Sequence, residues 1–288
     1  MPHTTPKLLW GSDRTVLPVT DGPDEFDDYN RTATPEQEQE AQEQLTRLFE
    51  VIDIWQVTDD QRDLVAQPGS PLAGDDRAVN PYHVSHAAIR EIGGALDHLH
   101  SLRMLVQEAR ALHTYAPFTL NRVAIECSAV AVWLLAPRYR DERIRRRLVL
   151  ETQNARDIDS VLRTMGETST LDDDLDDIRK VAAKRPSLDG NGIVGTPKRV
   201  ETMVREAGDA FDLGSEAALT AWKFCSGITH KRVWASINLL DREQLSHVAN
   251  VGNYHVTASF KNVFAVTAIS VVFSKEARRL FDLRAMPS

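Results

Sequence analysis

The chain has 288 residues and is 42% hydrophobic, which is enough for a sizeable core. Its net charge of −8 excludes a protein that coats a polyanion over its whole surface, so a nucleic-acid partner needs a local basic patch. No amino-terminal export signal is visible, and the apolar run Val263 to Phe273 is too short to cross a bilayer. We therefore expect a cytoplasmic protein with free thiols, no membrane partner and no cofactor.

The amino-terminal third predicts a tail, a helix, a linker and a long helix. Residues 1–34 are rich in Pro, Asp and Thr, have no apolar period and are typical of a disordered tail. From Pro35 to about residue 57, apolar residues recur at helical spacing behind a Gln/Glu face. Residues 58–80 contain clustered turn residues and predict a linker. A seam of three- and four-residue steps then predicts a helix over about 81–113 that packs lengthwise on another.

The middle of the chain predicts three more helices. Pro117 opens and Pro137 closes a segment that is apolar nearly all round, so we place this helix at the centre of the bundle. An amphipathic helix over 138–166 follows. Ser169 and Thr170 cap the next helix, whose early turns hold five aspartates and whose end is basic. That order complements the helix dipole, whereas the aspartate spacing matches no calcium loop, so we prefer the dipole to a metal site.

The carboxy-terminal third predicts two clear helices and one ambiguous stretch before the last helix. Thr196-Pro197 indicates a cap and first turn of a short helix. Ser215 caps a helix expected over 215–235. Residues 238–257 are ambiguous, and Gly252-Asn253 is a candidate turn of a short hairpin. A last amphipathic helix is expected over about 259–282.

These segments together predict an all-α fold. We expect a bundle of seven or eight helices with a disordered N-terminal tail and a short hairpin near 240–257. Residues 35–288 are expected to form a single helical domain.

The helix over 215–235 carries the strongest candidate for a functional site. Ser226 and His230 lie one turn apart in an otherwise apolar row, and Lys223 flanks the same face. A buried hydroxyl and imidazole need partners, because an orphaned buried donor costs about 1–3 kcal/mol. Arg122 and Glu126 lie one turn apart near the start of the central helix. They are expected to pair with each other, or Glu126 is expected to orient His230.

Two interpretations of these residues stay open. The first is a structural polar network that fixes the register of the helices, and this is the default because such networks are common and also perturb pKa values. The second is an acid/base or phosphate-contacting site in which His230 carries the proton.

The segment from Lys223 through Phe-Cys-Ser-Gly-Ile-Thr to His230 resembles the Arg-(four to six residues)-His signature of HEPN-type domains. These are all-helical bundles found in many toxin, defence and RNA-processing systems. In catalytic members the Arg and His cleave RNA without a metal, in a cleft that dimerisation assembles. The resemblance extends loosely over about 81–235 and implies RNA as a partner, a homodimer and a catalytic His230. The first position here is Lys, which lacks the bidentate fork of Arg.

A basic stretch over 138–147 is the second candidate site. It contains six arginines: Arg138, Arg140, Arg143, Arg145, Arg146 and Arg147. With Tyr139 among them, they suit the binding of RNA or single-stranded DNA. The alternative is a solvated helix face that pairs with Glu142 and Glu151, and it fits the acidic net charge better.

Other chemistries find less support. His83 and His86 lie one turn apart, but no third metal ligand and no His-Glu-x-x-His pattern accompanies them. Cys225 and His230 lie about 140° apart around a helix, which does not suit a thiolate–imidazole pair. Three functions stay open. One is a HEPN-like RNA-cleaving protein of a toxin or defence type. The second is a noncatalytic helical module that binds RNA or a protein partner. The third is a ligand-sensing or scaffold protein whose polar core is purely structural.

Overall fold

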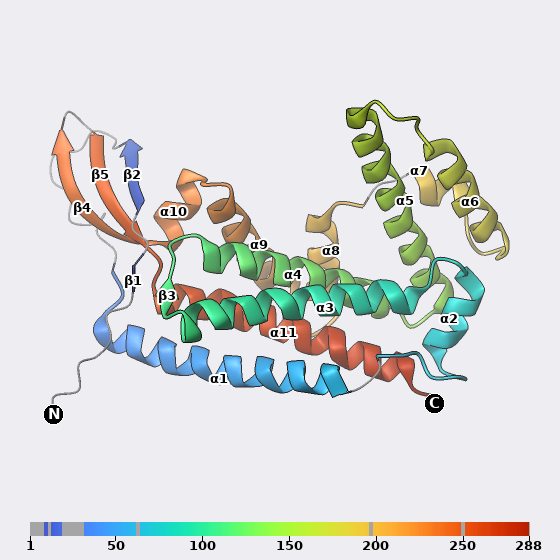
Figure 1. Cartoon of the computed structure of the whole chain (residues 1–288), viewed down its shortest axis with the longest axis horizontal. Helices are drawn as coiled ribbons and strands as arrows, with labels where there is room; N and C mark the ends of the chain where they lie inside the picture. Colours follow the sequence, from blue (N-terminus) through green and yellow to red (C-terminus); the bar gives the residue numbers. More distant parts are fainter. Residues whose placement is uncertain are drawn as a thin grey trace. The chain divides into compact units, whose positions relative to one another are not determined.

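The structure, a computed structural model, describes residues 9–10, 13–18, 32–61, 64–195, 198–248 and 251–287. Within these residues eleven α-helices account for most of the chain, so the predicted all-α class is confirmed (Figure 1). Residue contacts divide the chain into two compact units. The first unit comprises Met1–Gln61, Gly94–Ile125 and Thr220–Val272, and the second comprises Arg62–Gly93, Glu126–Leu219 and Phe273–Ser288.

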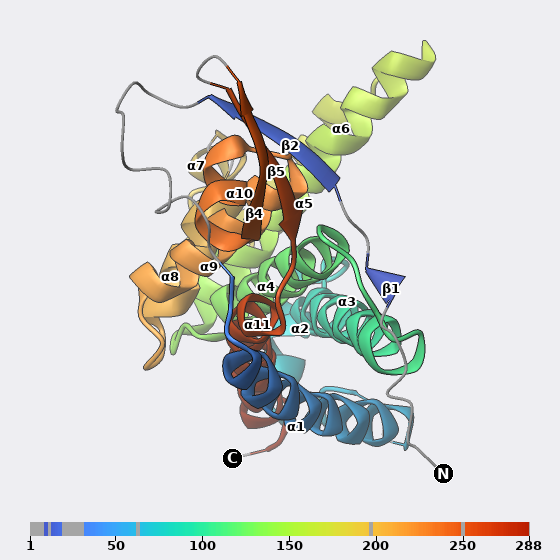
Figure 2. The ribbon, with the colours of Figure 1, turned by 90° about the vertical axis from the view of Figure 1, so that its left-hand side faces the viewer.

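The first unit combines helices with two small sheets. Its helical segments are α1 (Pro35–Gln61), the second half of α3 (Val84–Arg103), the π-helical turn η2 (Met104–Glu108), the first half of α4 (Ala116–Leu135), most of α9 (Ser215–Thr229), α10 (Val233–Leu239) and the first half of α11 (Phe260–Ala285). Its strands are β1 (Leu9–Trp10), β2 (Asp13–Pro18), β3 (Ala111–Leu112), β4 (Asp241–Val248) and β5 (Val251–Thr257). β1 pairs with β3 in parallel, and β5 lies between β2 and β4 in an antiparallel sheet (Figure 2).

The predicted hairpin near 240–257 is present, but its turn is not where the sequence suggested. Val248 lies opposite Val251, so the two strands meet at these residues. Gly252 and Asn253 lie inside β5, paired with β4, and not at the turn.

A part of the predicted tail is ordered into strands. β2 adds to the free edge of β5, with Asp13 opposite Val256. A strand edge has unpaired backbone donors and acceptors, and β2 satisfies those of β5. The remainder of the predicted tail, apart from residues 32–34, lies outside the described residues, so the disorder expected there stays a prediction.

The apolar seams predicted from helical spacing form the core of the first unit. Leu45, Phe49 and Ile52 of α1 are at most 1% exposed and belong to one cluster with buried residues of α3, α4, α9, α10, β5 and α11. Their three- and four-residue spacing puts them on one face of α1, and that face is buried.

A buried polar network links α4 to α11 in this core. The Asn121 amide donates to Thr267 Oγ1 (3.0 Å), and Ser270 donates to Asn121 Oδ1 (2.7 Å). All three residues are buried, so each bond satisfies a group that has no access to water. The sequence predicted a register-fixing network among Ser226, His230, Arg122 and Glu126, whereas this buried network consists of other residues.

The second unit is built around α5. Its helices are α2 (Pro71–Val79), the first half of α3, the second half of α4, α5 (Arg140–Met165), α6 (Leu171–Ala183), α7 (Gly190–Gly195), α8 (Val200–Asp209), the start of α9 and the end of α11. α5 packs against α2, α6 and α7. Trp133, Leu148 and Phe273 are fully buried in this unit. The single domain predicted over 35–288 stays a prediction, since α3, α4, α9 and α11 contribute residues to both units.

The described residues contain more helices than predicted because short ones were interpreted as linkers. Ser70 and Pro71 are the N-cap and first residue of α2, with Ser70 Oγ accepting from the Ala73 amide (3.1 Å). α6 begins at Leu171 with aspartates in its first turn, as the dipole interpretation predicted. The cap predicted at Thr196-Pro197 lies outside the described residues, and α8 begins at Val200.

Candidate functional site

His230 lies just beyond the end of α9, in the first unit. The helix was predicted to continue to residue 235, but it ends at Thr229. The amide of Lys231 donates to the Ile228 carbonyl (3.0 Å) and that of Arg232 to the Gly227 carbonyl (2.8 Å). Lys231 has a φ of 52°, in the left-handed region. These two bonds and the left-handed residue form a Schellman motif, a common way for an α-helix to end.

This ending places His230 in solvent. The row of residues predicted to face the core ends with α9, and the His230 side chain is exposed while Ser226, one turn earlier, is half-buried. Lys223 is exposed two turns before the end of the helix. The expectation of a buried imidazole is therefore wrong, because the backbone turns away before a further helical turn can bury it.

Arg122 of α4 contacts His230 across 108 residues of sequence. Arg122 Nη1 lies 3.4 Å from His230 Nε2, and Thr119 Oγ1 lies 3.2 Å from Thr229 Oγ1 one turn earlier on α4. A guanidinium only donates, so His230 Nε2 is the acceptor in this contact. The contact therefore places a proton acceptor, His230 Nε2, beside the positive charge of Arg122.

The fifth predicted residue, Glu126, follows Arg122 by one turn of α4 and belongs to the second unit. The orientation of His230 by Glu126 stays a prediction. The structure brings Arg122 and His230 together, and it places Ser226 and Lys223 on the same α9 helix that leads to the pair.

Basic and aromatic side chains follow His230 in the chain. The residues after His230 are exposed: Lys231, Arg232, Val233 and Trp234. Lys231 Nζ lies 4.9 Å from the centre of the Tyr115 ring, and the Trp234 ring lies 5.5 Å from that of Phe224.

Gly227 permits the position of Trp234. A Cβ at Gly227 would lie 2.8 Å from Trp234 Cζ2 and 2.5 Å from the Ala235 Cβ, so only glycine fits beneath the indole. Trp234 nevertheless remains 48% exposed. The Lys-Arg-Val-Trp run was the signal for this surface in the sequence.

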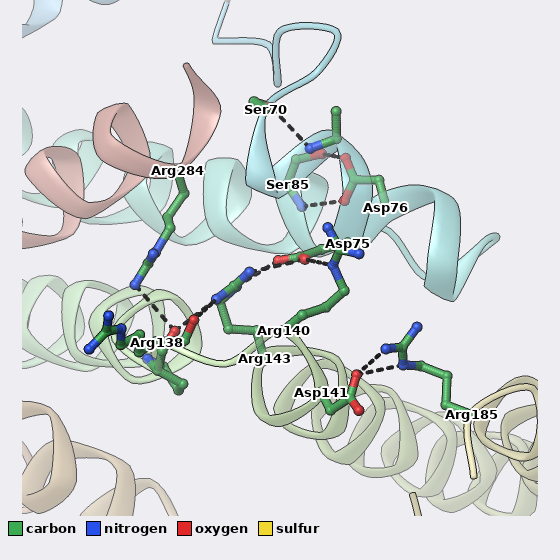
Figure 3. Close-up of polar contacts among 12 residues, drawn as sticks. Ser70, Asp75, Asp76, Ser85, Arg138, Arg140, Asp141, Arg143, Arg185 and Arg284 are labelled. Carbon is green, nitrogen blue, oxygen red and sulfur yellow. Dashed lines mark hydrogen bonds and ion pairs between the residues drawn. The ribbon is translucent and has the colours of Figure 1, made fainter. Parts of the chain in front are cut away.

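The arginine stretch does not form one cationic surface. Asp75 of α2 is fully buried and accepts from Arg140 Nε (2.9 Å) and from Arg143 Nε (2.6 Å) and Nη2 (3.0 Å), as Figure 3 shows. Arg143 is 2% exposed and also donates to the carbonyls of Pro137 and Arg138. A buried guanidinium that donates four hydrogen bonds to Asp75 and two backbone carbonyls holds helices together and is not available to a phosphate.

The next arginines are also held by carboxylates. Arg145 and Arg146 bind Glu142 (2.7 and 2.8 Å), and these bonds lower the pKa of that carboxyl to about 2. Arg147 is buried and binds Glu151 (2.7 Å). The reason is helical geometry: the eight residues of this stretch that lie in α5, 140–147, spread around the whole helix, so several of the arginines must face the core.

Of the six arginines, Arg138 and Arg140 are the exposed ones. Among the described residues, Arg138 is the member of the set without an ion pair. The prediction that all six arginines form one nucleic-acid-binding surface is therefore wrong for Arg143 and Arg147, which are buried. The alternative, in which the arginines pair with Glu142 and Glu151, describes this stretch better.

Neither thiol is poised for nucleophilic chemistry. Burial, followed by the charge of Glu91, raises the pKa of Cys127 to about 12, and burial also raises that of Cys225. The His83 and His86 rings lie 4.6 Å apart. In the described part of the chain no three His, Cys, Asp or Glu residues gather closely enough to hold a metal ion.

Within the described residues α4 is the one helix long and apolar enough to cross a membrane by length and composition. Of its most apolar stretch, 61% is buried, which is also typical of the core helix of a water-soluble protein. This is weak evidence for a membrane span, so the cellular location stays a prediction. Comparison of the chain with models of protein families, with curated proteins and with solved structures finds no match.

Proposed function

We propose that the first unit binds RNA and cleaves it with Arg122 and His230. The observation that carries this proposal is the 3.4 Å contact between the half-buried Arg122 of α4 and the exposed imidazole of His230, just beyond the end of α9. The resemblance of the Lys223 to His230 segment to HEPN-type domains supports it. Arg122 supplies the planar fork that Lys223 lacks.

The pair suits cleavage of a ribose phosphodiester. When RNA binds, Arg122 turns from His230 Nε2 to the phosphate and frees the Nε2 lone pair. His230 Nε2 then takes the proton of the ribose 2′-hydroxyl while that oxygen bonds to the adjacent phosphorus. The bond from phosphorus to the 5′-oxygen breaks, and that oxygen takes a proton from water. The imidazolium returns its proton to the hydroxide that remains. The products are a cyclic phosphate and a 5′-hydroxyl end. Arg122 donates to the non-bridging oxygens, where negative charge accumulates in the transition state.

The surface beside the pair suits a single strand. Lys231 and Arg232 offer positive charge to the backbone, and the exposed Trp234 ring offers a face on which a base stacks. Such stacking contributes about 1–3 kcal/mol per base and tolerates any sequence.

The test is cleavage of labelled single-stranded and structured RNAs in EDTA. Wild type is expected to cleave, whereas His230→Ala and Arg122→Ala are expected to lose about 100-fold or more in rate. His113→Ala, an exposed histidine of the same unit, is the matched control. Equal rates for His230→Ala and His113→Ala would remove the pair from the mechanism.

A noncatalytic interaction module is the second candidate. Ile158, Val161 and Met165 lie on one side of α5 and are 45–68% exposed, so this end of the helix presents an apolar stripe to solvent. If wild type cleaves no RNA, and His230→Ala keeps the melting temperature of wild type, this function becomes the better supported one.

A further inference from the structure

A pocket of about 540 Å³ lies within the second unit and shares no residue with the Arg122–His230 pair. Its lining comes from α3, α4, α5, α8 and the two residues that precede α8. The volume falls in the range of about 300–1,000 Å³ typical of small-molecule sites.

Part of the lining of this pocket is apolar. Val130 of α4, Leu150 of α5 and Met203 of α8 line it, and Val130 and Met203 are at most 9% exposed. The exposed Val200 also belongs to this apolar part. A ligand that fills the pocket therefore gains by burying an apolar body, at about 25 cal/mol per Å².

The two carboxylates in the lining are already engaged. Glu91 pairs with Arg90 (3.3 Å), and its side chain is 18% exposed. Asp157 accepts from the Gln153 amide (2.8 Å). Glu91 is therefore neutralised by a cation, whereas the Gln153 amide is neutral and leaves the charge of Asp157 in the lining.

The lining holds three cations, Arg90, Lys198 and Arg199, against the two carboxylates. Lys198 pairs with Glu206 (2.5 Å). Arg199 is exposed, and in the part of the chain that the structure describes it forms no ion pair. It is also the N-cap residue of α8, and the positive end of that helix dipole adds to its charge.

We infer that this pocket binds a small organic anion with an apolar body. The body lies against Val130, Leu150 and Met203, and the carboxylate or phosphate binds Arg199. The inference does not depend on RNA cleavage, because the pocket and the pair have no residue in common.

The first experiment measures binding of anilinonaphthalenesulfonate, a fluorescent aromatic anion, to the full chain. Saturable binding to one site is expected for wild type. Arg199→Glu is expected to weaken it about tenfold or more, since a charge-assisted bond contributes about 1.5–3 kcal/mol. Arg205→Glu, an exposed arginine of α8 outside the pocket, is the matched control and is expected to bind as wild type does.

Competition identifies the anion. Hexanoate and hexyl phosphate carry the same apolar chain with different anions, and the stronger competitor shows whether carboxylate or phosphate is preferred. Hexanol, with the same chain and no charge, is expected to displace the probe less well than either. Arg199→Ala replaces the charge reversal if the latter lowers the melting temperature. The inference is overturned by absent saturable binding, by equal affinity of the Arg199→Glu and Arg205→Glu variants, or by displacement with hexanol as effective as with the anions.

Discussion

Replacing Lys231 with glycine separates a structural role of the turn after α9 from a role in ligand binding. Lys231 has a φ of 52°, a left-handed conformation that costs a residue with a Cβ about 1–2 kcal/mol. Glycine removes this cost but adds about 0.5–1 kcal/mol of chain freedom to the unfolded state. Loss of the 4.9 Å contact between the Lys231 ammonium and the Tyr115 ring costs about 0.5–1 kcal/mol more. The three contributions cancel to within about 1 kcal/mol, so the melting temperature is expected to change by no more than about 4 °C.

Binding of RNA is expected to change even though stability does not. If Lys231 contacts a backbone phosphate, Lys231→Gly lowers affinity for a labelled single-stranded oligonucleotide. It also reduces the slope of log affinity against log salt by about 0.7. Lys231→Arg keeps the charge and is expected to bind as wild type does. An unchanged slope in the glycine variant would refute the phosphate contact. A large fall in its melting temperature would show that the turn needs lysine for its own stability.

Two predictions concern the second unit. Asp75→Asn leaves Arg143 buried without its carboxylate and is expected to lower the free energy of unfolding in urea by about 3–5 kcal/mol. The control is Asp172→Asn, in the exposed first turn of α6, which is expected to lower it by under about 1 kcal/mol. Equal urea midpoints for the two variants would mean that the buried pair does not stabilise the fold. Bonds from Arg145 lower the pKa of Glu142 in the folded state from 4.5 to about 2. This carboxylate therefore adds stability above pH 4.5 that is lost as the pH falls toward 2. Glu142→Gln is expected to have a shallower loss of urea midpoint over that range, and parallel curves would contradict this.

The two candidate sites named by the sequence have different outcomes in the structure. Catalysis requires a solvent-reachable His230, and His230 is exposed. A purely structural role predicts arginines dispersed among acids, and the stretch over 138–147 is largely of this kind. The proposed function therefore rests on the Arg122–His230 pair.

The sequence by itself determined the helices whose apolar spacing is regular. The seams of α1 and α3 and the uniformly apolar α4 were visible because a 3.6-residue period is a local property of the chain. The end of α9 was not visible, because the residue that adopts the left-handed conformation is Lys231 and not the glycine that usually marks a helix end.

Only the tertiary structure decided which polar groups meet. Arg122 and His230 are 108 residues apart, and Asp75 and Arg143 are 68 apart, so no spacing in the chain relates them. The burial of Asp75 also decided which arginines face inward, because a buried carboxylate must be paired. Helical periodicity assigns a side chain to a face of its own helix, whereas the packing of distant segments determines the partner that this face meets.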